Sequence, residues 1–108
     1  MNDSEFESRA EQVLARLEAS LEASGADLDW ERAGSGILEI EFADGSRMVV
    51  NRHGAAQEIW VAARSGGFHF RWDGQRWVDT RGGAELFGRL AQLLSEQAGE
   101  SVRVWGDG

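Results

Sequence analysis

The sequence predicts an α+β fold, a two-layer α-β sandwich in which two helices pack on one face of an antiparallel sheet of five or six strands. Two apolar stripes at helical spacing lie near the two ends of the 108-residue chain. Short runs with period-two alternation, separated by glycine turns, fill the middle. With 42% hydrophobic residues the chain can build one core, so we expect a single domain over residues 1–108.

The first helix is predicted from apolar residues at intervals of three and four, namely Phe6, Ala10, Val13, Leu14, Leu17 and Leu21. Ser4 and Glu7 have the spacing of a capping box, which places the start of the helix at Ser4. Gly25 is a typical terminator at its other end. Residues 26–35 are expected to form a polar connector.

The middle of the chain is predicted to be a meander of strands over residues 37–42, 47–51, 59–63, 68–72 and 75–78. Its turns are Asp44-Gly45, the Ser65-Gly66-Gly67 run and Asp73-Gly74. A second helix is expected over residues 84–98, where leucines and Phe87 form an apolar face and Gly99 follows. A short strand or extended segment is expected from Val102 to Trp105.

Negative charge is concentrated in the first 44 residues, which hold 12 Asp and Glu against three Arg. This stretch has a charge of -9, whereas the whole chain has a net charge of -8. On a helix, Glu7, Glu11, Glu18 and Glu22 fall within an arc of about 60°. Arg9 and Arg16 project from nearly the opposite side, so they cannot neutralise this stripe. If residues 26–35 are extended, Asp27, Asp29 and Glu31 point to one side and continue the stripe as a ridge.

Such a stripe is in many proteins only a solvated helix face. Its one-sidedness and its continuation bring a second interpretation, a surface for cations or for a basic partner, closer to even with the first. Carboxylates are hard ligands for Mg²⁺, Ca²⁺, Mn²⁺ or iron, but an open row without a cage predicts weak and unselective binding.

Several classes of function are disfavoured. The chain has no Cys, which excludes disulfides and thiolate sites, and no nucleotide-binding or hydrolase motif, so we do not expect an enzyme. Its negative charge argues against nucleic-acid binding. No apolar run is long enough to span a membrane, and no leader sequence is apparent, so we expect a soluble, cytoplasmic protein.

Strand alternation predicts that Trp60 faces outward beside Asn51 on the neighbouring strand. An outward Trp either packs against cross-strand neighbours or serves as a binding hot spot. His53 and His69 stand apart in the sequence, and His69 is expected to be a surface or hydrogen-bonded imidazole.

Four segments of the chain are distinctive, namely MNDSEF at the start, GILEIEFADGSRMVVNR (36–52), EIWVAARSGGFHF (58–70) and AGESV (98–102). Through these segments, and over essentially its whole length, the sequence resembles the frataxin family, in its bacterial branch, CyaY. The resemblance implies an α-β sandwich, weak binding of Fe²⁺ and Fe³⁺ on an acidic ridge, and docking on the cysteine desulfurase that supplies the iron–sulfur scaffold protein. Carried onto this chain, the ridge comprises Glu18, Glu22, Asp27, Asp29 and Glu31, with Glu11, Glu7 and Asp3 as further acids. The partner-binding sheet surface comprises Asn51, Arg52 and Trp60.

Three departures from the family pattern stand out. Ala19 and Ala23 occupy positions that are often acidic, so the ridge is thinner and iron binding is expected to be lower. The loop before Ile59 lacks a common proline, which predicts greater mobility. Glu58 replaces the usual Gln and is expected to weaken a hydrogen bond beside Trp60.

The resemblance favours a monomeric regulator of cluster formation, with iron-driven oligomers left open. An iron chaperone or store is the alternative, and a third interpretation, an acidic inhibitor or nucleic-acid mimic, would need no metal.

Overall fold

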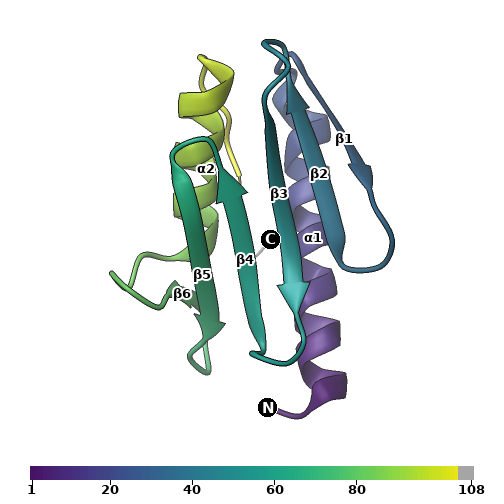
Figure 1. Ribbon diagram of the computed structural model, residues 1–108, viewed down its shortest axis with the longest axis vertical. Coiled ribbons are helices and arrows are strands. Elements are labelled where there is room, and N and C mark those ends of the chain that lie inside the picture. Colours follow the sequence, from purple (N-terminus) through teal and green to yellow (C-terminus); the bar gives the residue numbers. More distant parts are fainter. Residues whose placement is uncertain (105–108) are drawn as a thin grey trace.

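Figure 1 shows the computed structural model, which describes residues 1–104, as one sheet with two helices on a single face. The strand order is β1-β2-β3-β4-β5-β6 and every neighbouring pair is antiparallel. The predicted α-β sandwich is therefore confirmed. In chain order the elements are α1 (Asp3–Ser24), β1 (Leu28–Arg32), β2 (Ile37–Phe42), β3 (Arg47–His53), β4 (Glu58–Ala63), β5 (Gly66–Trp72), β6 (Trp77–Asp79) and α2 (Leu86–Ala98).

Helix α1 begins earlier than predicted. Asn2, not Ser4, is its N-cap, and the Asn2 side chain accepts a hydrogen bond of 2.7 Å from the backbone N–H of Glu5. Asn is as good an N-cap as Ser, and Asn2 and Glu5 have the same three-residue spacing as Ser4 and Glu7, so the earlier start is available. At the other end Gly25 adopts the left-handed conformation with φ of 69°, as predicted for the terminator.

The predicted connector over residues 26–35 is wrong in its central part, which is the edge strand β1. Leu28 and Trp30 face the helices and pack on the core, while Asp29 and Glu31 alternate with them on the other side. Apolar contacts at every second residue therefore stabilise a strand here. The many charged residues of the segment made this strand hard to predict from the sequence.

The rest of the meander matches the prediction except at its boundaries. Strand β3 runs two residues beyond Asn51, β5 begins two residues before Phe68, and β6 covers Trp77–Asp79 in place of residues 75–78. Helix α2 begins at Leu86 because the Glu85 carboxylate caps it. Residues 101–104 form no strand, although Val102 is buried, and Trp105 lies outside the described residues.

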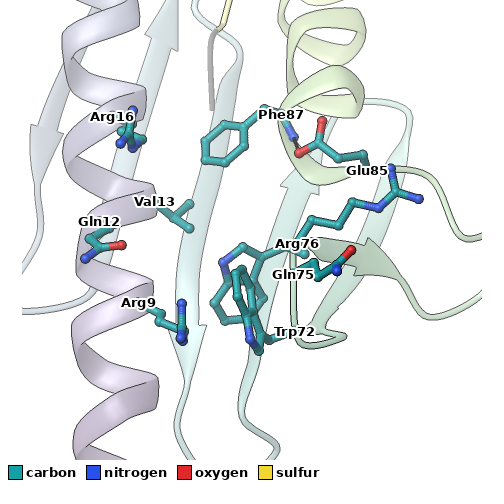
Figure 2. A pocket seen from close by; sticks show the side chains of 10 residues that line it. Arg9, Gln12, Val13, Arg16, Trp72, Gln75, Arg76, Glu85 and Phe87 are labelled. Atoms are coloured by element: carbon teal, nitrogen blue, oxygen red, sulfur yellow. Dashed lines mark hydrogen bonds between the residues drawn. The ribbon is translucent and has the colours of Figure 1, made fainter. Parts of the chain in front are cut away.

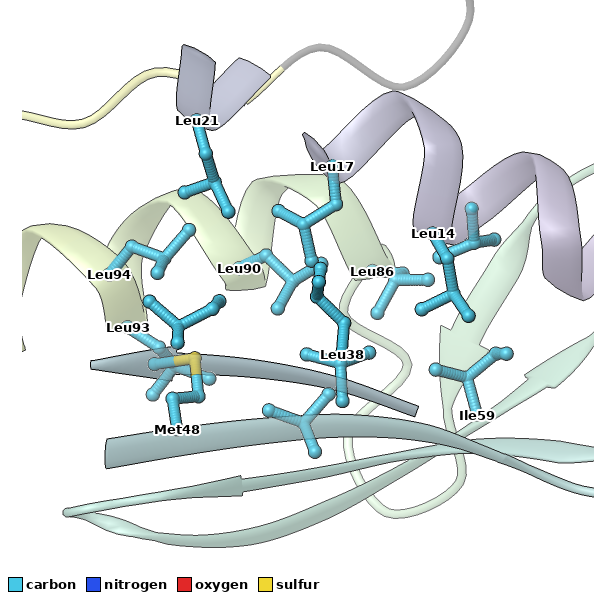
Figure 3. Packing of buried hydrophobic residues seen from close by; sticks show 14 of the residues in the cluster. Leu14, Leu17, Leu21, Leu38, Met48, Ile59, Leu86, Leu90, Leu93 and Leu94 are labelled. Carbon is cyan, nitrogen blue, oxygen red and sulfur yellow. The ribbon is translucent and has the colours of Figure 1, made fainter. Parts of the chain in front are cut away.

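The core lies between the sheet and the helices. Figure 3 shows leucines of α1 and α2 against Leu38, Met48 and Ile59 of the sheet. The outward-facing side of the sheet carries no helix, so its side chains form an open face (Figure 1). In the described part of the chain no helix is long and apolar enough to cross a membrane.

Candidate functional site

The acidic stripe of α1 is partly neutralised by a strand arginine. Arg32, at the end of β1, donates two hydrogen bonds to Glu11, of 3.1 and 2.8 Å, and contacts Glu18 at 2.9 Å. Among the described residues, Arg9 and Arg16 form no ion pair with the stripe, as predicted, because they lie on other sides of the helix. The neutralising residue belongs to β1, which runs beside α1, so the spacing within the helix could not reveal it.

The ion pair with Arg32 also sets the protonation of the stripe. Hydrogen bonds from Arg32 lower the pKa of Glu11, against a smaller opposing effect of burial. In return, the hydrogen bond to Glu11 raises the pKa of Arg32. Glu11 therefore stays ionised and bound to Arg32 at any pH near neutrality, which leaves it less available to a ligand.

Arg52 does not share the open face with Asn51 and Trp60. Its register partner is the buried Ile59, so its side chain lies on the helix side of the sheet, 3.3 Å from Glu7. The predicted grouping of Arg52 with the partner-binding surface is thus wrong in its placement. Strict alternation along β3 separates Arg52 from the residue before it.

Four carboxylates gather on the open face at the β1 edge of the sheet. Asp29 lies directly opposite Glu41, and Glu31 lies opposite Glu39. We call this set the acidic sheet face. Their strand neighbours Trp30, Ile40 and Leu38 point the other way, toward the core. On the other side of β2, Arg47 is the cross-strand partner of Glu41 and lies 3.9 Å from Glu39. Like charges placed directly opposite each other on a sheet oppose folding, so packing does not account for this arrangement.

The predicted ridge is therefore two groups of acids, separated by the backbone of β1. Glu7, Glu11, Glu18 and Glu22 lie on α1, whereas Asp29 and Glu31 belong to the acidic sheet face with two residues that the ridge did not include, Glu39 and Glu41. Asp27 is exposed at the junction, and Asp3 is exposed in the first turn of α1. Among residues 1–104 no three His, Asp or Glu side chains are grouped so that they could hold a metal ion.

Trp60 stands at the centre of a second cluster on the open face, between two imidazoles. His53 stacks on one side of the indole at a centroid distance of 3.9 Å, and His69 stacks on the other at 4.4 Å. Asn51 is the cross-strand neighbour of Trp60, as alternation predicts. Trp60 therefore packs against cross-strand neighbours, as one of the two interpretations of the sequence predicted. The sequence did not predict that both histidines are among these neighbours.

Glu58, two residues before Trp60 on β4, holds the indole of this cluster in place. Its carboxylate accepts hydrogen bonds from the Trp60 indole N–H (2.8 Å) and from Arg71 (2.7 Å). Burial alone would raise the pKa of Glu58, but these two hydrogen bonds and the charge of Arg71 outweigh it and lower the pKa. The expectation that Glu58 weakens the hydrogen bond is wrong, because the carboxylate is a stronger acceptor for the indole than a neutral amide.

The comparisons with known proteins agree with this geometry. A family model described as "Frataxin-like domain" matches residues 1–100. The chain belongs to the frataxin family, in its bacterial CyaY branch. A relative from Dechloromonas aromatica, named "Iron-sulfur cluster assembly protein CyaY", is 64% identical over 102 residues, which are 94% of this chain and 97% of the relative.

Two solved frataxins are similar in structure. The frataxin from Psychromonas ingrahamii has a TM-score of 0.88 at 32% identity and covers 95% of this chain and 97% of its own. Trimeric frataxin from Saccharomyces cerevisiae, described as complexed with ferrous iron, has a TM-score of 0.71 at 26% identity and covers 85% and 87%.

Ala19 and Ala23 are exposed on α1 and carry no charge, and a stripe thinner than in other frataxins stays a prediction. The proline-free loop after His53 is held by local contacts. The backbone N–H of Ala56 donates to His53 Nδ1 (3.2 Å), and the Gln57 amide donates to the carbonyl of Met1 (2.8 Å). Gln57 has a positive φ of 54°, which is uncommon for a residue other than glycine.

Proposed function

We propose that this protein is a regulator of iron–sulfur cluster assembly that binds its partners without catalysing a reaction. It docks on the cysteine desulfurase through its carboxylates and modulates cluster formation on the scaffold protein. Membership of the frataxin family and the names of the CyaY relatives support this role.

The acidic sheet face is the observation that carries the docking proposal. In the described part of the chain, Asp29, Glu31 and Glu41 form no ion pair, and neither do Glu22 and Asp27 nearby. Glu11 and Glu18 are held by Arg32, so the free negative charge is concentrated around β1 and the C-terminal end of α1. A patch of net negative charge attracts a basic partner surface over a distance of about one Debye length, roughly 8–10 Å.

The stacked cluster around Trp60 supplies a second contact. A tryptophan fixed between two imidazoles has little side-chain freedom to lose on binding, and tryptophan is enriched among residues that dominate interface energy. Asn51 beside it offers an amide for a hydrogen bond. Both sites lie on the same open face of the sheet, so one partner complex can engage them together.

The test is calorimetric titration of the protein into the host's cysteine desulfurase at low and at moderate salt. We expect binding that weakens with salt and that Asp29→Lys/Glu31→Lys abolishes. These lysines would face Glu41 and Glu39, so the fold should be kept, and circular dichroism of the variant checks this. No binding of the wild-type protein at either salt would contradict the proposal.

An iron carrier is the second candidate, favoured by the yeast frataxin described as complexed with ferrous iron. Carboxylates are hard ligands, but no three of them among residues 1–104 are grouped to hold an ion, so the acidic sheet face predicts weak affinity. As an iron carrier, the protein would deliver iron and would not need to bind the desulfurase. Ferrous titration followed by NMR separates the two. Iron binding without desulfurase binding supports the carrier, and desulfurase binding by iron-free protein supports the regulator.

A further inference from the structure

The helix side of the molecule has a pocket of about 410 Å³ that is remote from the acidic sheet face. It forms because α1 has 22 residues and α2 only 13, so the N-terminal half of α1 has no helix beside it (Figure 1). The hairpin between β5 and β6 closes the space from the sheet side with Trp72 and Trp77. A volume in the range of about 300–1,000 Å³ is typical of small-molecule sites.

One wall of the pocket is aromatic and apolar. Figure 2 shows the Trp72 ring below, Val13 on α1 and Phe87 at the start of α2. Trp72 packs edge-on against Trp77 at 5.7 Å, and the Arg9 guanidinium lies 4.2 Å from its ring centroid. These two contacts hold the indole in place as an apolar wall against which a flat ligand can pack.

The polar part of the lining is cationic. Arg9, Arg16 and Arg76 contribute three guanidinium groups, in a protein whose net charge is -8. Arg16 and Arg76 form no ion pair with any described residue, and Arg9 is paired only with the exposed Glu5. The single acid of the lining is Glu85.

Glu85 forms no ion pair with these arginines in the described part of the chain. Its two carboxylate oxygens accept hydrogen bonds from the backbone N–H groups of Phe87 (2.8 Å) and Gly88 (2.9 Å) as the cap of α2. The pocket thus combines an aromatic surface with guanidinium groups of which two, Arg16 and Arg76, form no ion pair with a described residue. Guanidinium groups match a carboxylate in geometry and charge, and the rings match a flat apolar body.

We propose that this pocket binds a small aromatic carboxylate. The ring of the ligand packs against Trp72 beside Phe87, and its carboxylate accepts hydrogen bonds from Arg16. This site is separate from the docking surface on the open face, so its occupancy is independent of the proposed function.

The test is a titration of the full-length protein with 1-naphthoate, followed by the NMR signals of the tryptophan indole N–H groups. Variants Trp72→Phe and Trp60→Phe assign the two signals of interest. We expect the Trp72 signal to shift with saturation and the Trp60 signal to stay unchanged. The neutral analogue 1-naphthamide should bind about tenfold more weakly, because it forfeits one charge-assisted hydrogen bond.

Arg16→Gln and Arg47→Gln form a matched pair, since each removes one positive charge and Arg47 lies on the open face. Arg16→Gln should weaken naphthoate binding about tenfold and Arg47→Gln should leave it unchanged. No saturable shift of Trp72 in the wild-type protein would overturn the proposal. Equal binding of the acid and the amide, or equal loss in the two variants, would also overturn it.

Discussion

Substituting Glu58 by glutamine tests the account of the cluster under Trp60. The Glu58 side chain is 8% exposed and accepts one hydrogen bond from the indole and one from Arg71. Glutamine has the same shape and still offers an acceptor to the indole, but it carries no charge. A comparison of the two residues therefore isolates the contribution of the buried carboxylate's charge.

The expected loss of stability at neutral pH is about 1 kcal/mol. A hydrogen bond to a charged group contributes about 1.5–3 kcal/mol against about 1 kcal/mol for a neutral one. Arg71 is 62% exposed, so solvent screens its part of the gain. The lower cost of burying a neutral amide offsets a further part.

The difference should depend on pH with a definite sign. The pKa of Glu58 is lowered in the folded protein, so the carboxylate contributes stability that is present above its ordinary value of 4.5. That contribution is lost as the pH falls through the folded pKa. The gap between wild type and Glu58→Gln should therefore be full at about pH 7 and shrink toward about pH 3.

Urea unfolding at a series of pH values, followed by tryptophan fluorescence, measures the gap as a change of midpoint at constant m-value. Arg71→Gln and the double variant complete a cycle, in which we expect a coupling of about 0.5–1 kcal/mol. A gap that stays constant with pH, or a Glu58→Gln protein more stable than wild type at neutral pH, would refute this reasoning.

Two further predictions concern the fold. Gly36→Ala should cost at least about 2 kcal/mol, because a Cβ there would lie 2.3 Å from the Arg52 side chain at a φ of 89°. Gly34→Ala is the control, because Gly34 has a φ of 76° but open space around it, and it should cost only about 1 kcal/mol. Equal losses of stability for the two variants in urea unfolding would show that the contact with Arg52 is unimportant. Gln97→Ala should cost about 2–4 kcal/mol, since this buried amide bonds the β2–β3 turn and the end of β4. The exposed Gln92→Ala is its control, and a melting temperature equally unchanged in both would contradict this role.

Much of the fold could be predicted because its signals are local. Alternation in β2 and the glycine turns depend on neighbouring residues only. Strand β1 was missed because three of its five residues are charged, and only pairing with β2 reveals it. The same pairing brings Glu39 and Glu41 opposite Glu31 and Asp29. Without the strand, the sequence offered no reason to join these four acids.

The side-chain contacts of the site could not be predicted for a related reason. Arg32 reaches Glu11 across 21 positions of sequence, and His53 and His69 reach Trp60 from two different strands. Each contact depends on strand register and on how the helix lies against the sheet edge. Spacing along a single element contains neither, so the outward position of Trp60 was predictable and its stacking partners were not.

The central claim is that carboxylates of the acidic sheet face dock on the cysteine desulfurase. The most direct measurement compares the dissociation constants of Glu31→Lys and Glu96→Lys for the desulfurase at one low ionic strength. Both variants change the net charge equally, but Glu96 is exposed on α2, at the other side of the molecule from β1 (Figure 1). We expect Glu31→Lys to bind at least about tenfold more weakly than Glu96→Lys. Equal affinities would show that only net charge matters and would contradict the claim.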